Sequence, residues 1–184
     1  MKREHYDSSS IKELDKPDIN EEALNFKSDE LHIEKKHVFH VGDESFSIYK
    51  CENEPYIHSF LKACSYYIYK PIYNNLTIDP PIARKYKADL MALDYTNEPK
   101  CWIECFERDY DKIEYICKHI HVEDFILVEL SDNINNYLEI LKKKIHYKYH
   151  HLISVINFVP EIIHYVDSND IYISDDWYHL IDLV

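Results

Sequence analysis

The sequence predicts an α/β protein built on a mixed β-sheet with helices on its faces. Three patterns lead to this prediction: a hairpin and an amphipathic helix in residues 37–69, two short apolar runs in 88–106, and a strand, helix and strand over 100–130. A chain of 184 residues, 46% of them hydrophobic, suits one domain with a substantial core. We expect this domain to span residues 31–184 and to follow a polar N-terminal arm, residues 1–30, which lacks periodicity.

The first elements predicted within the domain are a hairpin and a helix. HVFHV and SFSIYK alternate in polarity on either side of Gly42, as the strands of a hairpin do. Asn53 is expected to cap the next helix, with Pro55 in its first turn. Apolar residues then recur at helical spacing up to Ile68. Residues 70–87 contain three prolines and a basic cluster, and are expected to form a loop.

The central elements form the part of the chain that bears on function. Residues 88–94 and 100–106 are short apolar runs joined by a turn, so they are expected to pair as antiparallel strands. Asp109 is expected to cap a helix with one apolar stripe. The run DFILVEL, 124–130, then follows a crossover helix, which favours a parallel strand.

The last third of the chain is predicted to close the fold. Asp132 is expected to cap a helix over 133–147 that carries lysines toward its C-terminal end, where they suit the helix dipole. Three runs, 152–159, 161–166 and 171–176, are expected to be closing strands.

The overall composition excludes several classes of function. A net charge of -13 opposes indiscriminate nucleic-acid binding, since neutralising phosphates needs lysine and arginine. The single glycine excludes glycine-rich phosphate loops. The start, MKREHYDSSS, has no apolar run, and five cysteines, an odd number, fit a reducing compartment. We therefore expect an acidic cytoplasmic protein that has no association with membranes.

Two carboxylates on the two central strands form the first candidate site. Side chains alternate along a strand, so Trp102, Glu104 and Phe106 are expected to share one face. If Asp89 lies on the same face of the neighbouring strand, the two carboxylates converge. Converging carboxylates hold Mg²⁺, which activates water and stabilises charge on a scissile phosphate.

These residues resemble the PD-(D/E)xK nuclease superfamily, and within it the YaeQ-like family. The resemblance rests on Asp89-Leu90-Met91, on Trp102-Ile103-Glu104 and on a helix containing Lys112-Ile113 and Cys117-Lys118, and it extends over roughly residues 37–178. It implies a restriction-endonuclease-like core, with Asp89 and Glu104 in the catalytic and metal-binding positions. It also implies a lysine two residues after the glutamate.

Phe106 occupies the place of that lysine, a departure that YaeQ-like proteins share. Lys87, two residues before Asp89, or Lys112 on the helix would have to supply the charge instead. Removing one preorganised electrostatic group typically costs roughly 10² to 10³ in rate. The departure therefore implies a degenerate site and a binding function without a cofactor. One alternative is an Mg²⁺-dependent nuclease with a relocated lysine, and another is that the carboxylates are polar strand ends beside core aromatic residues such as Trp102.

The segment KKKIHYKYHH is the second candidate site. It carries four lysines, three histidines and no acid. Positive charge interleaved with tyrosines contacts RNA phosphates and stacks on bases. The predicted RNA-binding residues are Lys142, Lys143, Lys144, Tyr147, Lys148 and Tyr149. The alternative interpretation is a solvated helix end.

A third cluster, made of cysteines and histidines, has two interpretations. Cys101 and Cys105 are expected on one strand face, with Cys117, His119 and His121 following. The spacing does not match the paired turns of structural zinc sites. Buried, inert cysteines are the preferred interpretation.

In size and general character the chain also resembles the conserved dormancy factor of microsporidian ribosomes. No residue is carried over from this resemblance. It implies a ribosome-associated factor on the small subunit near the tRNA exit site, which contacts rRNA and basic ribosomal proteins and inhibits translation during dormancy. An acidic protein with a small basic, aromatic face suits such a particle, where RNA and basic proteins are adjacent.

Overall fold

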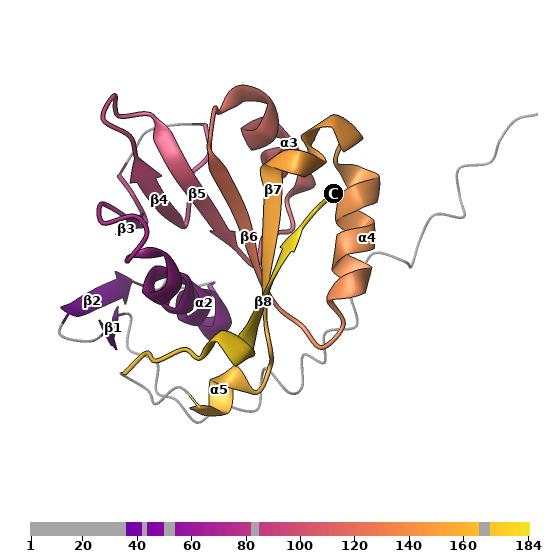
Figure 1. Ribbon diagram of the computed structural model, residues 1–184. Coiled ribbons are helices and arrows are strands. Elements are labelled where there is room, and N and C mark those ends of the chain that lie inside the picture. Colours follow the sequence, from indigo (N-terminus) through magenta and orange to yellow (C-terminus); the bar gives the residue numbers. More distant parts are fainter. Residues whose placement is uncertain (1–35, 42–43, 50–53, 82–84, 166–169) are drawn as a thin grey trace, which may run out of the picture.

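The computed structural model describes residues 36–41, 44–49, 54–81, 85–165 and 170–184. A mixed six-stranded sheet lies at the centre of these residues, with the strand order β3-β4-β5-β6-β7-β8 (Figure 1). The strands are β3 (Thr77–Ile78), β4 (Leu90–Leu93), β5 (Pro99–Cys105), β6 (Asp124–Leu130), β7 (Ile153–Phe158) and β8 (Tyr178–Asp182). Strands β5, β6 and β7 are parallel, and the other pairs are antiparallel. The predicted α/β class and mixed sheet are confirmed.

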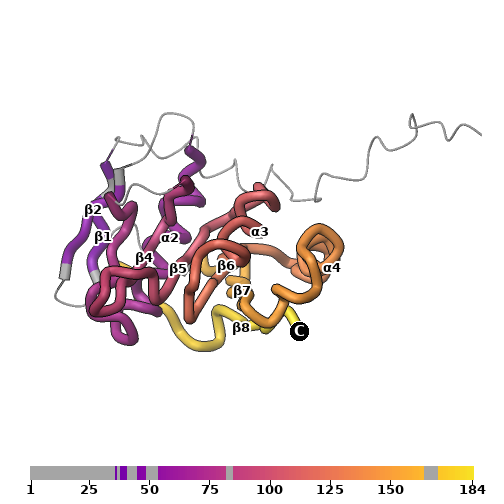
Figure 2. Tube along the Cα trace, turned by 90° about the horizontal axis from the view of Figure 1, so that it is seen from above, coloured from indigo at the N-terminus to yellow at the C-terminus, as the bar shows by residue number. Residues whose placement is uncertain are grey.

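Helices cover both faces of the sheet because its strands alternate between two apolar cores. Helix α2 (Tyr56–Tyr69) packs on the face that carries Cys101, Ile103 and Cys105. Helices α3 (Tyr110–His119) and α4 (Ile134–Lys144) pack on the opposite face, which buries Trp102 completely. Figures 1 and 2 both show α3 next to α4. None of the helices in the described ranges is long and apolar enough to cross a membrane.

The predicted hairpin is present as a separate two-stranded sheet. Strands β1 (Lys36–Val41) and β2 (Glu44–Tyr49) pair antiparallel, and Phe39 and Ile48 bury their side chains in the core on the α2 side. The predicted turn at Gly42 and the predicted N-terminal arm, residues 1–30, lie outside the described residues.

Two of the predicted helix boundaries need correction. Pro55 is the N-cap of α2, one position before the first turn in which it was predicted, and Asn53 lies outside the described residues. The N-cap of helix α4 is Asn133 instead of the predicted Asp132. It also ends at Lys144, because the next residue, Ile145, is extended and buries its side chain among the core residues on the α3 and α4 side. A short 3-10 helix, η1 (Tyr147–Leu152), follows.

The C-terminal strand predictions are right for β7 and wrong for the two later runs. The run 161–166 contains a short helix, α5 (Ile162–Tyr165), and a 3-10 turn, η2 (Asp175–Trp177), follows the bridge at Asp170. The closing strand is β8, which begins at Tyr178. A short apolar run does not distinguish a strand from a buried helix by its period alone, which explains the error. Strand β3, within the predicted loop 70–87, is likewise absent from the predicted elements.

Candidate functional site

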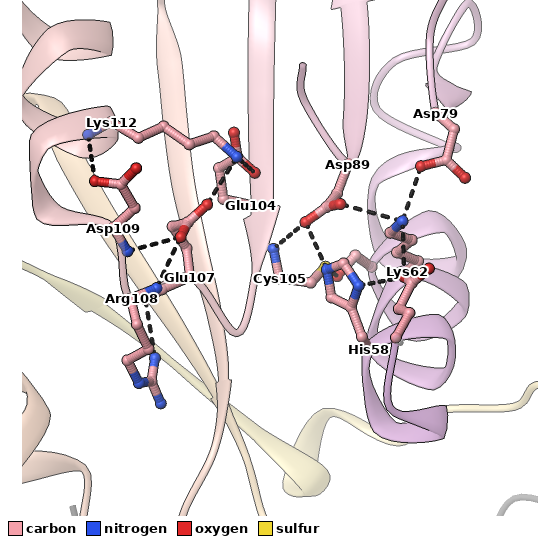
Figure 3. A network of polar contacts seen from close by, with 12 residues as sticks. His58, Lys62, Asp79, Asp89, Glu104, Cys105, Glu107, Arg108, Asp109 and Lys112 are labelled. Atoms are coloured by element: carbon pink, nitrogen blue, oxygen red, sulfur yellow. Dashed lines mark hydrogen bonds and ion pairs between the residues drawn. The ribbon is translucent and has the colours of Figure 1, made fainter. Parts of the chain in front are cut away.

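Asp89 and Glu104 are cross-strand neighbours at one end of the β4 and β5 pair. The antiparallel register pairs Leu90 with Ile103, so one position further Asp89 lies opposite Glu104. The amide of Asp89 donates to the carbonyl of Ile103 at 3.2 Å. Their side chains nevertheless bind different helices: Figure 3 shows Asp89 contacting residues of α2 and Glu104 contacting Lys112 of α3.

Asp89 is the acceptor at the centre of a charged cluster on α2. Its Oδ2 accepts from His58 Nε2 at 2.9 Å and from the amide of Cys105 at 2.7 Å, and its Oδ1 lies 3.1 Å from Lys62 Nζ. Burial opposes its ionisation, but the hydrogen bond from His58, the charges of His58 and Lys62 and the Cys105 amide lower the pKa of Asp89 to about 2. Asp89 is therefore a firmly ionised carboxylate.

Lys62 is the cation that compensates this carboxylate, and it is only 5% exposed. Its ammonium also contacts Asp79 at 2.8 Å and Glu54 at 3.2 Å. Burial lowers the pKa of Lys62, but the three carboxylates outweigh burial and raise it above its usual value. Glu54 additionally contacts His58, which completes a network of buried ion pairs between α2 and the sheet.

Glu104 has a different environment, on the α3 side of the sheet. Its Oε1 accepts from the indole Nε1 of Trp102 at 2.6 Å, and its Oε2 accepts from Lys112 Nζ at 2.8 Å. The side chain is 1% exposed. Burial and the charge of Asp89 raise the pKa of Glu104 to about 8, although Lys112 and Trp102 act in the opposite direction. The two neighbouring carboxyl groups thus have strongly different acidities.

Phe106 does not continue the strand face on which Trp102 and Glu104 lie, contrary to the prediction. Strand β5 ends at Cys105, and Phe106 has a φ of 55°, in the left-handed region. Its ring packs against the core on the α2 side. Alternation along a strand requires extended backbone, so the break at Phe106 removes this position from the Glu104 face.

Of the two lysines predicted as replacements, Lys112 contacts the carboxylate cluster. Asp109 caps α3 by accepting from the Lys112 amide at 3.1 Å, as predicted, and so fixes the first turn of the helix. The Lys112 ammonium also contacts Glu107 at 2.7 Å. Lys87 is exposed, two residues before Asp89.

These contacts determine whether the carboxyl oxygens of Asp89 and Glu104 are available to Mg²⁺. Each of the four oxygens of Asp89 and Glu104 accepts a hydrogen bond or contacts an ammonium group. A divalent cation between them would lie close to the ammonium groups of Lys62 and Lys112, which would repel it. In the part of the chain that the structure describes, no group of three or more His, Cys, Asp or Glu side chains is arranged to hold a metal ion. As arranged, the donor set does not fit Mg²⁺.

Several of these residues were missed by the sequence analysis. His58 and Lys62 are four residues apart on α2, so they lie on one side of the helix, and Glu54, just before the N-cap Pro55, contacts both of them. That spacing was the available signal. Arg108 was also missed: its guanidinium binds the buried Glu129 through two nitrogens and lies over the rings of Phe106 and Tyr137. No local pattern indicates that pair, since its members are on different elements.

The predicted RNA-binding residues lie within one segment, 142–149, which we call the basic patch. It consists of Lys142, Lys143, Lys144, Tyr147, Lys148 and Tyr149, at the end of α4 and the start of η1. The four lysines are exposed, and Tyr147 is 78% exposed. The ring of Tyr147 stacks on His146 at 4.7 Å between centroids, while Tyr149 packs partly against the core and carries Lys148 4.6 Å above its ring.

The cysteines lie in different environments. Cys101 and Cys105 are buried on the α2 side of the sheet, whereas Cys117 lies on α3 at the opposite face. Burial raises the pKa of Cys101 and Cys117, each to about 12. Their thiols are therefore protonated and weakly reactive.

Comparison with solved structures shows which fold this is. The structure is similar to that of YaeQ from Xanthomonas axonopodis pv. citri, with a TM-score of 0.52 and 13% identity over 80% of this chain and 94% of that one. It is likewise similar to YaeQ from Pseudomonas syringae, with a TM-score of 0.52 and 12% identity over 76% and 82% of the two chains. No protein-family model and no curated protein sequence matches. The chain therefore has a YaeQ-like fold.

Proposed function

We propose that this protein is a non-catalytic factor that binds RNA, and that its partner is the small ribosomal subunit. The observation that carries the proposal is the basic patch, where four exposed lysines lie within a few residues of an exposed tyrosine ring. The ammonium groups neutralise phosphates, and a ring exposed on one side stacks on an unpaired base. Tyr147 is held by its contact with His146, so a base would meet a ring that is already oriented.

The carboxylate cluster supports a role without catalysis. Lys62 and Lys112 lie against the two carboxyl groups on which a nuclease mechanism would depend. The basic patch also lies on other elements than the carboxylates. It precedes the start of β7, whereas Glu104 lies on β5, two strands away in the sheet. RNA bound at the patch thus contacts elements other than the strands that carry the carboxylates.

The charge distribution supports a ribosomal partner. The chain has a net charge of -13, and residues 152–184 contain acids but no lysine or arginine. Such a protein is repelled by bare RNA except at the patch, and is attracted by basic proteins. A ribosomal subunit offers both surfaces. Under this proposal the factor occupies the region of the tRNA exit site in the cytoplasm, excludes tRNA and silences translation during dormancy.

The test is co-sedimentation of the protein with small ribosomal subunits over a series of salt concentrations. We expect saturable binding that weakens with salt. Replacing Lys142, Lys143, Lys144 and Lys148 by glutamine should reduce the slope of log affinity against log salt by about 0.7 for each phosphate that is no longer neutralised, about 3 in total. Lys70→Gln, at the end of α2, is the control and should leave the slope unchanged. Equal binding by the fourfold variant and the unmodified protein would refute the proposal.

A second candidate function is favoured by one contact. Lys112 lies 2.8 Å from Glu104, so a relocated lysine is available to a Mg²⁺-dependent nuclease if metal binding displaces the ion pair. The same preparation is therefore incubated with RNA and DNA in Mg²⁺. Cleavage that is abolished in both Glu104→Gln and Lys112→Met, with their folds intact by circular dichroism, would establish the nuclease and overturn the non-catalytic proposal.

A further inference from the structure

A second group of aromatic and basic side chains lies on α3 and on the segment before β4. We call it the α3 platform; it consists of Lys85, Tyr86, Tyr115 and His119. The rings of Tyr86 and Tyr115 meet edge to face at 5.3 Å between centroids, and His119 lies 4.6 Å from Tyr115. The ammonium of Lys85 lies 4.2 Å from the Tyr115 centroid and 4.9 Å from that of Tyr86. Residues distant in sequence thus form one assembled surface.

The placement of the platform follows from the helical period of α3. Ile113 and Ile116 are fully buried and fix one face of the helix against the sheet. Tyr115 and His119 are four residues apart, so they share the adjoining face. The four platform residues differ in exposure: Tyr86 and Tyr115 are partly buried, whereas Lys85 and His119 are exposed. The rings are therefore held in place and still reach solvent.

The charges around the platform favour a phosphate backbone. Lys87 and Lys118 are exposed beside it. Of the acids of α3, Asp111 lies one turn before Tyr115 on the same face, and Glu114 directly precedes Tyr115, so the positive charge is concentrated at the last turn of the helix. Glu123, in the loop that follows, is paired with Lys100 at 3.5 Å. The end of α3 thus combines positive charge with aromatic faces, which is the chemistry of a site for single-stranded nucleic acid.

The platform and the basic patch lie at the same end of the molecule. Helix α3 packs alongside η1, which carries Tyr147 and Tyr149. In Figure 1 the last turn of α3 and the last turn of α4 are both at the end of the sheet where β6 and β7 begin. Figure 2, seen from above, shows the two helices side by side.

We propose that Tyr86 and Tyr115 form a second stacking site for the bases of single-stranded RNA, which continues the basic patch across the end of α3. This inference rests on the proposed RNA-binding function and specifies its ligand as an unpaired strand that contacts both surfaces. On binding, a base would stack on the tyrosine rings, and Lys85 would turn from them to a phosphate. A duplex keeps its bases stacked inside, so it gains nothing from the platform.

The experiment measures the affinity of the full chain for oligouridylates of about 4 and about 12 nucleotides, lengths within the range of single-strand sites. Tyr115→Leu keeps apolar packing but removes the aromatic face. We expect it to weaken binding of the longer strand by about 5-fold to 160-fold, the effect of losing one stacked base. The shorter strand, which reaches the patch alone, and a duplex of the same length should be unaffected. Tyr115→Phe should restore the affinity, which separates stacking from any change in the fold.

Matched variants separate the two kinds of contact. Lys85→Gln should lower the salt slope for the longer strand by about 0.7, whereas Tyr115→Leu should leave the slope unchanged. Tyr172→Leu removes an exposed ring that contacts Tyr67 on α2, and should leave the affinity unchanged. If Tyr115→Leu alters the circular dichroism spectrum, Tyr86→Leu replaces it in the same comparison.

The outcomes distinguish the two proposals. If the longer strand binds, if neutralising the patch lysines abolishes binding, and if the tyrosine variants match the unmodified protein, the platform is refuted and the patch stands. If no oligouridylate binds and small subunits do not sediment with the protein, both fail. Weaker binding of the longer strand alone in Tyr115→Leu, reversed in Tyr115→Phe, establishes the second site.

Discussion

The buried ammonium of Lys62 offers the sharpest test of whether the charged cluster is structural. Lys62→Met fills the same space with an apolar chain and removes the charge. Asp79 is 48% exposed and regains water readily, but Glu54 and Asp89 are 12% and 14% exposed and do not. Removing one member of a buried ion pair typically costs about 3 to 5 kcal/mol, since the other charge remains buried without compensation. His58 still binds Asp89, so we expect the lower end, about 3 kcal/mol.

The assay is urea denaturation followed by circular dichroism. With about 1 to 3 kcal/mol per molar urea for small proteins, the midpoint should fall by about 1 to 3 M. The double variant Lys62→Met with Asp89→Asn should recover much of the loss, because asparagine still accepts from the Cys105 amide and leaves no charge behind. Lys143→Met is the control: its ammonium is 4.0 Å from Glu139 on the surface, and such pairs contribute about 0 to 1 kcal/mol.

The result that would refute this reasoning is a Lys62→Met variant within about 1 kcal/mol of the unmodified protein. A Lys62→Met variant that is more stable than the unmodified protein would contradict the reasoning more strongly. Charges retained for activity commonly reduce stability, so stabilisation would favour the nuclease alternative over a structural cluster.

Two further predictions concern pH and helix capping. The pKa of Glu104 is raised from its usual 4.5 to about 8, so the folded protein binds the proton of this carboxyl group more tightly than the unfolded chain does. The resulting contribution to stability is fully present below pH 4.5 and is lost as the pH rises toward 8. The raised pKa of His58 acts in the same direction. Thermal unfolding from about pH 5 to about pH 9 should therefore show a falling midpoint that Glu104→Gln flattens, and parallel curves for both proteins would contradict this. Asp109→Ala removes the cap on the Lys112 amide and should lower the free energy of unfolding, measured by urea denaturation, by about 1 kcal/mol. Asp111→Ala removes only a charge near the end of the helix dipole and should lower it by less. Equal losses in the two variants would show that the cap contributes nothing.

The candidate site was only partly accessible from the sequence. Asp89 and Glu104 were predicted as neighbours because antiparallel strands joined by a short turn fix the register between them. Their partners were not predictable in the same way. Lys62 precedes Asp89 by 27 positions and meets it only because α2 packs across the sheet. The spacing of His58 and Lys62 places them on one side of a helix, but it does not indicate which strand that side faces.

The sequence by itself determined the elements whose signals are local. Period and capping located the hairpin, the central strands and α3, because side chains within one element interact at fixed intervals. Tertiary structure decided what local signals leave open. It ended α4 at Lys144 to bury Ile145, made α5 helical and placed the closing strand at Tyr178. It also turned Phe106 off its strand and joined Tyr86 to Tyr115. These outcomes depend on contacts between elements distant in sequence, and the free energy of burying side chains together outweighs local preference there.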